Sequence, residues 1–138
     1  MTLRSAIRVG LGVIYGAAGV LHLAAPHPFV GIVPSFVPAP ALVVAATGVA
    51  ELAGAAALLQ PWSLRLRHAA GWSFAAYALC VWPANINHML IDLAKPDRGL
   101  GLGYHVPRMF LQPVLIWLAP WVAGAIDWPW RKGATRSG

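Results

Sequence analysis

The sequence predicts an all-α integral membrane protein, a bundle of four transmembrane helices with a proline-rich outer loop between the first two. Of the 138 residues, 59% are hydrophobic and 10% are charged, whereas a soluble domain carries about 25% charged residues. The apolar residues fall into four runs, each long enough for a bilayer core of about 30 Å. Prolines and short polar stretches separate the runs. This pattern excludes a disordered chain and a nucleic-acid-binding module, and we expect a lipid bilayer as the first partner.

We expect a single membrane domain over residues 1–138, with helices at about 7–25, 39–60, 68–93 and 107–128. The first run follows Arg4 and Arg8 and so resembles a signal peptide. Its length and its stripe of Gly12, Gly16 and Gly19 instead predict a helix that packs closely against a neighbour. The single cysteine, Cys80, excludes an intramolecular disulfide and is interpreted as a small apolar residue.

The basic residues predict a multi-pass protein of the cell membrane with both termini in the cytoplasm. Seven of them fall on the side of the termini and three on the other side, and an excess of Lys and Arg marks the cytoplasmic side. The first group is Arg4, Arg8, Arg65, Arg67, Arg131, Lys132 and Arg136, and the second is Lys95, Arg98 and Arg108.

The segment between the first two helices contains five prolines separated by apolar residues. These are Pro26, Pro28, Pro34, Pro38 and Pro40. Proline fixes the φ angle, so the loop is stiff, and its apolar side chains predict that it folds back over the bundle or lies in the interface. It is either a plain connector or a lid that faces a substrate.

Glu51 is the ionisable residue expected deepest in the membrane, about 18 Å from the start of its helix at 1.5 Å per residue. An ionisable group in hydrocarbon costs about 2.5–3.5 kcal/mol on insertion scales. We therefore expect Glu51 to face the interior, where it either accepts hydrogen bonds or stays protonated. It serves as an acid or base, or it fixes helix packing.

The third and fourth helices carry further polar residues at helical spacing. Asn85, His88 and Asp92 share one face, with Tyr77 near the same stripe, and Arg108 and Gln112 share a face of the next helix. Their depths overlap in the outer half of the bundle, which predicts a single site, with independent interhelical bonds as the rival. The candidate catalytic residues are Glu51, His88 and Arg108, and the candidate ligand-binding residues are His22, Asn85, Gln112 and Tyr77.

Four histidines are expected near the outer end: His22, His27, His88 and His105. Such residues can bind zinc, copper or haem iron. The chain has no HxxxH, HExxH or CxxC pair, so we expect interfacial and hydrogen-bonding histidines and no metal or haem.

Four segments together resemble the DoxX-like family of small membrane proteins. The segments are Gly19–His22 with the prolines after it, Gly48–Glu51, Trp82–Asn85 and Arg108–Gln112. The resemblance implies a four-helix membrane fold and an association with redox complexes, including thiosulfate:quinone oxidoreductases. Glu51, Asn85, Arg108 and Gln112 are the positions that match these motifs and carry polar chemistry.

Three functional hypotheses remain open from the sequence. The first is a redox-associated, quinone-facing subunit, with a quinone as the ligand and an oxidoreductase subunit as the partner. The second is an acid–base enzyme acting on a lipid-soluble substrate. The third is a non-enzymatic subunit that binds a membrane partner or a second copy of the chain. A quinone site needs a hydrogen-bond donor and a proton relay beside an apolar slot, and the candidate residues can supply both.

Overall fold

The computed structural model describes residues 2–129 and confirms an all-α fold. The described part contains five helices: α1 (Leu3–Ala24), α2 (His27–Val30), α3 (Pro40–Leu59), α4 (Leu64–Leu93) and α5 (Gly101–Ala123). Three helices begin at recognisable signals. Thr2 caps α1 by accepting a hydrogen bond from the Ser5 N–H, Pro40 opens α3, and Ser63 caps α4 through the Leu66 N–H.

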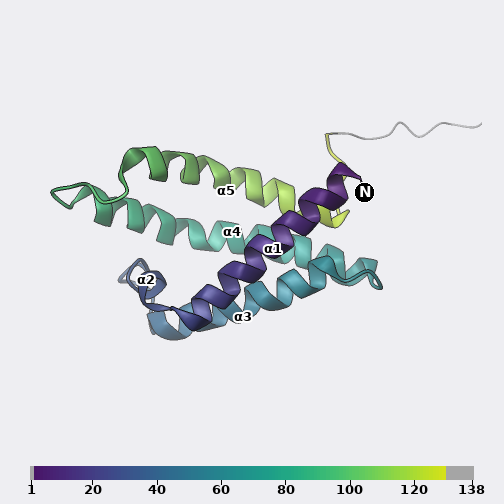
Figure 1. Cartoon of the computed structure of the whole chain (residues 1–138), viewed down its shortest axis with the longest axis horizontal. Helices are drawn as coiled ribbons and strands as arrows, with labels where there is room; N and C mark the ends of the chain where they lie inside the picture. The colour runs from purple at the N-terminus through teal and green to yellow at the C-terminus, as the bar shows by residue number, and fades with distance from the viewer. Residues whose placement is uncertain (1, 130–138) are drawn as a thin grey trace, which may run out of the picture.

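The helices pack as two pairs, α4 along α5 and α1 along α3, and α3 also contacts α4 (Figure 1). The end of α1, the short helix α2, the start of α3 and the α4–α5 connection lie at one end of the bundle. We call this the distal end. The start of α1, the α3–α4 connection and the end of α5 form the opposite, proximal end (Figure 1).

Several predicted boundaries were wrong. The proline-rich loop contains the extra helix α2, because Pro28 is tolerated in a first turn where its missing N–H has no intrahelical partner. The last helix begins at Gly101, six residues before the expected start at Pro107, and ends at Ala123, five residues before the expected end. Gly124 ends it in the left-handed conformation, with φ 85°.

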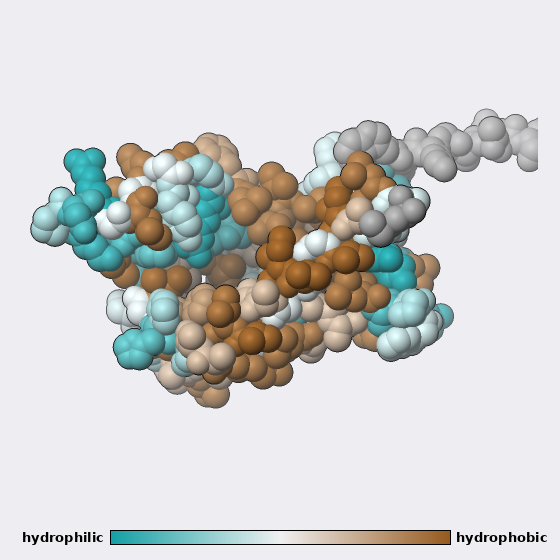
Figure 2. Space-filling model, in the orientation of Figure 1, coloured by the Kyte–Doolittle hydropathy of each residue, from teal (hydrophilic) through white to brown (hydrophobic). Residues whose placement is uncertain are grey.

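Three of the described helices, α1, α3 and α5, are long and apolar enough to cross a membrane. Helix α4 has 30 residues, about 45 Å at 1.5 Å per residue, but it carries more polar residues and is not one of these three candidate spans. Figure 2 shows apolar atoms over the middle of the molecule and hydrophilic atoms gathered towards its two ends. This surface is compatible with a lipid bilayer around the middle.

Glycines let the paired helices approach closely. A Cβ at Gly19 of α1 would lie 2.8 Å from the Gly48 carbonyl oxygen of α3, and a Cβ at Gly48 would lie 2.8 Å from His22 Cβ. On α4, a Cβ at Gly71 would lie 2.9 Å from the Ala119 carbonyl oxygen of α5. Small residues therefore set the spacing in both helix pairs, and Gly19 lies on the stripe that the sequence predicted.

Arg4 fixes the start of α1 to the end of α5 at the proximal end. Its guanidinium donates to the carbonyl oxygens of Trp121 and Ile126 and forms an ion pair with Asp127 at 2.7 Å. The two ends of the described chain therefore lie at the same end of the bundle. Three basic residues counted in the topology prediction, Arg131, Lys132 and Arg136, lie outside the described residues.

Candidate functional site

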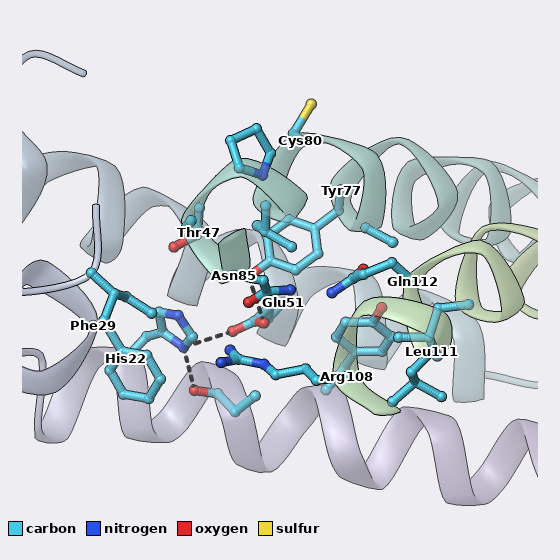
Figure 3. Close-up of a pocket in the computed structure, with 18 of the residues that line it drawn as sticks. His22, Phe29, Thr47, Glu51, Tyr77, Cys80, Asn85, Arg108, Leu111 and Gln112 are labelled. Carbon is cyan, nitrogen blue, oxygen red and sulfur yellow. Dashed lines mark hydrogen bonds and ion pairs between the residues drawn. The ribbon is translucent and has the colours of Figure 1, made fainter. Parts of the chain in front are cut away.

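A cavity of about 780 Å³ lies between the two helix pairs. Helices α1, α3, α4 and α5 and the proline-rich loop with α2 all contribute to its walls, which are mostly apolar. Six of the seven predicted site residues line it: His22, Glu51, Tyr77, Asn85, Arg108 and Gln112. Figure 3 shows these side chains drawn from four helices around a common space. The structure therefore brings together residues up to 90 positions apart in the chain (22 to 112).

Glu51 is buried in the bundle, with 3% of its surface exposed, as its expected depth predicted. The Tyr77 hydroxyl donates a hydrogen bond to its Oε1 at 2.7 Å. His22 Nδ1 lies 3.0 Å from the other oxygen, Oε2, and 2.8 Å from the Ala18 carbonyl oxygen. Since the Ala18 oxygen is an acceptor, Nδ1 carries a hydrogen and donates it there. The buried Glu51 Oε2 lies beside Nδ1 but accepts no hydrogen bond within the described chain. The Glu51 carboxyl is thus held between a phenol and an imidazole at the cavity wall (Figure 3).

Two buried amides in the cavity wall form no hydrogen bond with another described residue. Asn85 is 4% exposed and Gln112 is 5% exposed, and no hydrogen bond joins either side chain to another residue in the range 2–129. The Gln112 Oε1 atom is fully buried and unpaired. A buried polar group without a partner costs about 1–3 kcal/mol. Unpaired amides in an apolar wall therefore indicate that something else supplies their hydrogen bonds.

Arg108 adds a cation to the cavity wall. Within the described residues it forms no ion pair with a carboxylate. Its Nη1 instead donates to His88 Nδ1 at 3.0 Å, and its guanidinium lies over the Tyr104 ring. The sequence leaves open whether Arg108 extends outward or turns in towards Glu51 or Asp92, and within the described residues it pairs with neither carboxylate. The guanidinium remains available for a hydrogen-bond acceptor in the cavity.

The proline-rich loop folds back over the cavity. Phe29 of α2 stacks on the His22 ring at a centroid distance of 3.9 Å, and Asn87 of α4 donates to the Ile32 carbonyl oxygen at 3.0 Å. Apolar loop residues, among them Val33 and Phe36, line the cavity. The loop is therefore part of the cavity wall, held by contacts with α1 and α4.

His88, the seventh predicted residue, lies outside the cavity wall, in a second polar cluster at the distal end. Asp92 is its centre and is 2% exposed. The carboxylate accepts hydrogen bonds from Lys95 Nζ at 2.6 Å, from the Leu100 N–H at 3.1 Å and from His105 Nε2 at 3.0 Å. The hydrogen bond with Asp92 raises the pKa of Lys95 above its ordinary value. The predicted face of α4 is thus divided, since Asn85 belongs to the cavity and Asp92 to this cluster.

The position of His105 differs from the one expected from the sequence. It was expected near the interface but is fully buried beside Asp92, and its Nδ1 has no partner within the described chain. The signal in the sequence is a histidine four residues before Asp92 and another 13 residues after it. The early start of α5 brings the second one onto the carboxylate.

The chain matches the model of a known protein family. No curated protein matches it, and no solved structure matches it. One family model matches residues 11–123, which include all of α2, α3, α4 and α5 and most of α1. The chain therefore belongs to the family described as a domain of unknown function, DUF8561.

Proposed function

We propose that this protein is a redox-associated integral membrane protein whose cavity binds a lipid-soluble quinone. The observation that carries the proposal is the pair of amides in the mostly apolar cavity wall, Asn85 and Gln112, which form no hydrogen bond with another described residue. The Arg108 guanidinium lines the same cavity and has further N–H donors beyond the one that His88 accepts. A quinone presents two carbonyl acceptors on a flat apolar ring. Each carbonyl can accept a hydrogen bond from an amide N–H or from the guanidinium, and the ring and its tail suit the apolar wall.

The proposal includes four transmembrane spans, with α4 as the fourth beside α1, α3 and α5. Helix α4 is long enough to cross a bilayer, and several of its polar side chains, including Tyr77 and Asn85, face the cavity. Ionisable and polar groups within a membrane usually face the interior of a bundle in this way. The DoxX-like resemblance supports the same four-span arrangement and the redox association.

The proposed topology places the proximal end in the cytoplasm. A Gly138→Cys substitution, made in a Cys80→Ala background, is expected to react with a membrane-impermeant maleimide only after the cells are opened. An Asp97→Cys substitution in the α4–α5 connection is the matched control and is expected to react in intact cells. Labelling of the Gly138→Cys variant from outside intact cells would show that the topology is inverted.

Glu51 is placed to move protons to and from a bound quinone. Reduction of a quinone to a hydroquinone takes up two electrons and two protons. The electrons come from a partner oxidoreductase subunit. Glu51 accepts a hydrogen bond from Tyr77 and lies beside His22, so the three side chains form a short relay of exchangeable protons along the cavity wall.

A binding titration tests the proposed ligand class. The full chain in detergent is titrated with a short-tailed quinone and, separately, with the same tail on an apolar ring that lacks carbonyl groups. We expect the quinone to quench tryptophan and tyrosine fluorescence saturably and the carbonyl-free ligand to bind at least about tenfold more weakly, since a hydrogen bond from a charged donor such as Arg108 is worth about 1.5–3 kcal/mol. Equal affinity for both ligands would contradict a quinone site.

The second candidate is an acid–base enzyme with a lipid-soluble substrate. The Tyr77–Glu51–His22 arrangement favours it, because a carboxyl held between two proton-carrying groups at an apolar cavity is suited to proton transfer. A lipid-soluble substrate without carbonyl acceptors that binds in the titration and exchanges a carbon-bound hydrogen with solvent would favour this enzyme.

The third hypothesis, a non-enzymatic subunit, would be favoured by a Glu51→Gln variant that keeps full cellular function.

A further inference from the structure

The cluster at the distal end has the donor atoms of a metal site. His88 and Asp92 are one turn apart on α4, and His105 comes from the neighbouring helix α5. One donor atom from each of the three side chains lies within 4.8 Å of the other two. Asp92 Oδ2 is 3.0 Å from His105 Nε2 and 3.5 Å from His88 Nε2. Ligands at about 2.0–2.2 Å from a tetrahedral zinc ion are about 3.3–3.6 Å apart, so small shifts would place all three around an ion.

The surroundings of Asp92 hold its carboxylate in place. The α4–α5 connection folds over it, and the Leu100 N–H donates to Oδ2. Gly99 makes this fold possible, because its φ is 51° and a Cβ there would overlap the Asp92 carboxylate. Asp92 and His105 are buried, while the His88 side chain is 20% exposed. Two of the three donor side chains are therefore buried, and the third is partly accessible to solvent.

From this geometry we propose that His88, Asp92 and His105 form a binding site for a divalent transition metal ion of the zinc type. Two imidazoles and one carboxylate are donors that zinc accepts, with a water molecule or another ligand in the fourth position. The site is separate from the cavity and does not depend on the proposed quinone.

Two cationic side chains beside the cluster affect its affinity for a metal ion. Lys95 pairs with Asp92 Oδ1 at 2.6 Å and repels a second cation. Arg108 donates to His88 Nδ1, so the hydrogen of the neutral imidazole is on Nε2, where the ion would bind. An ion on Nε2 moves this hydrogen to Nδ1 and displaces Arg108 from His88. Because Arg108 lines the cavity, metal binding also frees its guanidinium there.

Titration with Co²⁺, followed by competition with Zn²⁺, tests the site. The full chain is purified without a polyhistidine tag, stripped with a chelator and titrated while its visible absorption is recorded. We expect about one Co²⁺ per chain, with ligand-field bands that disappear as Zn²⁺ is added. The His88→Gln and His105→Gln substitutions are each expected to lower the affinity more than about tenfold. His27→Gln, in an exposed histidine of α2, is the matched control and should bind as the wild type does.

Substitution of the two neighbouring cationic residues provides a second test of the site. Lys95→Met and Arg108→Gln are each expected to raise the affinity for Co²⁺, which a purely structural hydrogen-bond network would not predict. Helix content is recorded for each variant, and if His105→Gln fails to fold, the partly exposed His88 decides the result. Absence of saturable Co²⁺ binding by the wild type, or wild-type affinity in His88→Gln, would overturn the proposal.

Discussion

The double variant Asn85→Leu/Gln112→Leu is expected to be more stable than the wild type and to bind quinones more weakly. Both amides are buried and form no hydrogen bond with another described residue, and the Gln112 Oε1 atom is fully buried. Replacing them with apolar side chains of similar size removes an unmet hydrogen-bonding cost of about 1–3 kcal/mol for each group. The same change removes two donors for the ligand, so we expect the affinity for a short-tailed quinone to fall at least about tenfold.

Thermal unfolding in detergent and the fluorescence titration measure the two effects. Asn87→Leu is the matched control, because the Asn87 amide is already paired with the Ile32 carbonyl oxygen. Loss of this hydrogen bond in Asn87→Leu is expected to lower the thermal stability of the protein. A loss of stability in the double variant, together with unchanged quinone affinity, would show that the two amides serve packing.

A large loss of stability is expected from a substitution at Gly19, where α1 contacts α3. A Cβ at this position would lie 2.8 Å from the Gly48 carbonyl oxygen and 2.9 Å from the Leu52 side chain. The backbone oxygen cannot move without separating the helices. We therefore expect Gly19→Val to lower the free energy of unfolding by about 1–3 kcal/mol or more, as overpacking does in other cores.

Gly10→Val is the control on the same helix. A Cβ at Gly10 has no neighbour within 4 Å, so the change in stability is expected to stay within about 0.5 kcal/mol. Denaturant or thermal unfolding in the same detergent compares the two variants. Equal stability of both would contradict the close α1–α3 contact.

The sequence predicted the helical architecture because apolar run lengths and proline positions are local signals. It failed where tertiary packing overrides them. Pro107 lies inside α5, although a proline usually marks a helix boundary and this one was expected at the start of the helix. Pro28, interpreted as part of a stiff loop, lies in the short helix α2. The exact ends of α5 could not be derived, because the chain before Pro107 is made helical by its packing on α4.

The shared location of the polar cavity residues could be predicted from the sequence, because burial cost singles out polar groups in apolar helices. Glu51, Asn85 and Gln112 are such groups, and the structure places all three at one cavity. The contacts of Arg108 could not be derived from the sequence, because they involve His88 and Tyr104 and therefore depend on how α4 and α5 are aligned. The cluster of Asp92 with His105 depends on the same alignment, which spacing along a single helix does not reveal.

Measurement of what the protein retains from its native membrane tests the proposed cavity function most directly. The wild type is purified in mild detergent and its bound molecules are extracted and identified by mass spectrometry, beside the variants Ala18→Phe and Ala17→Phe. Ala18 lines the cavity, whereas Ala17 is exposed on the same helix and does not line it. We predict about one quinone per chain in the wild type and in Ala17→Phe, and none in Ala18→Phe. Equal quinone content in all three proteins, or none in the wild type, would contradict a quinone-binding cavity.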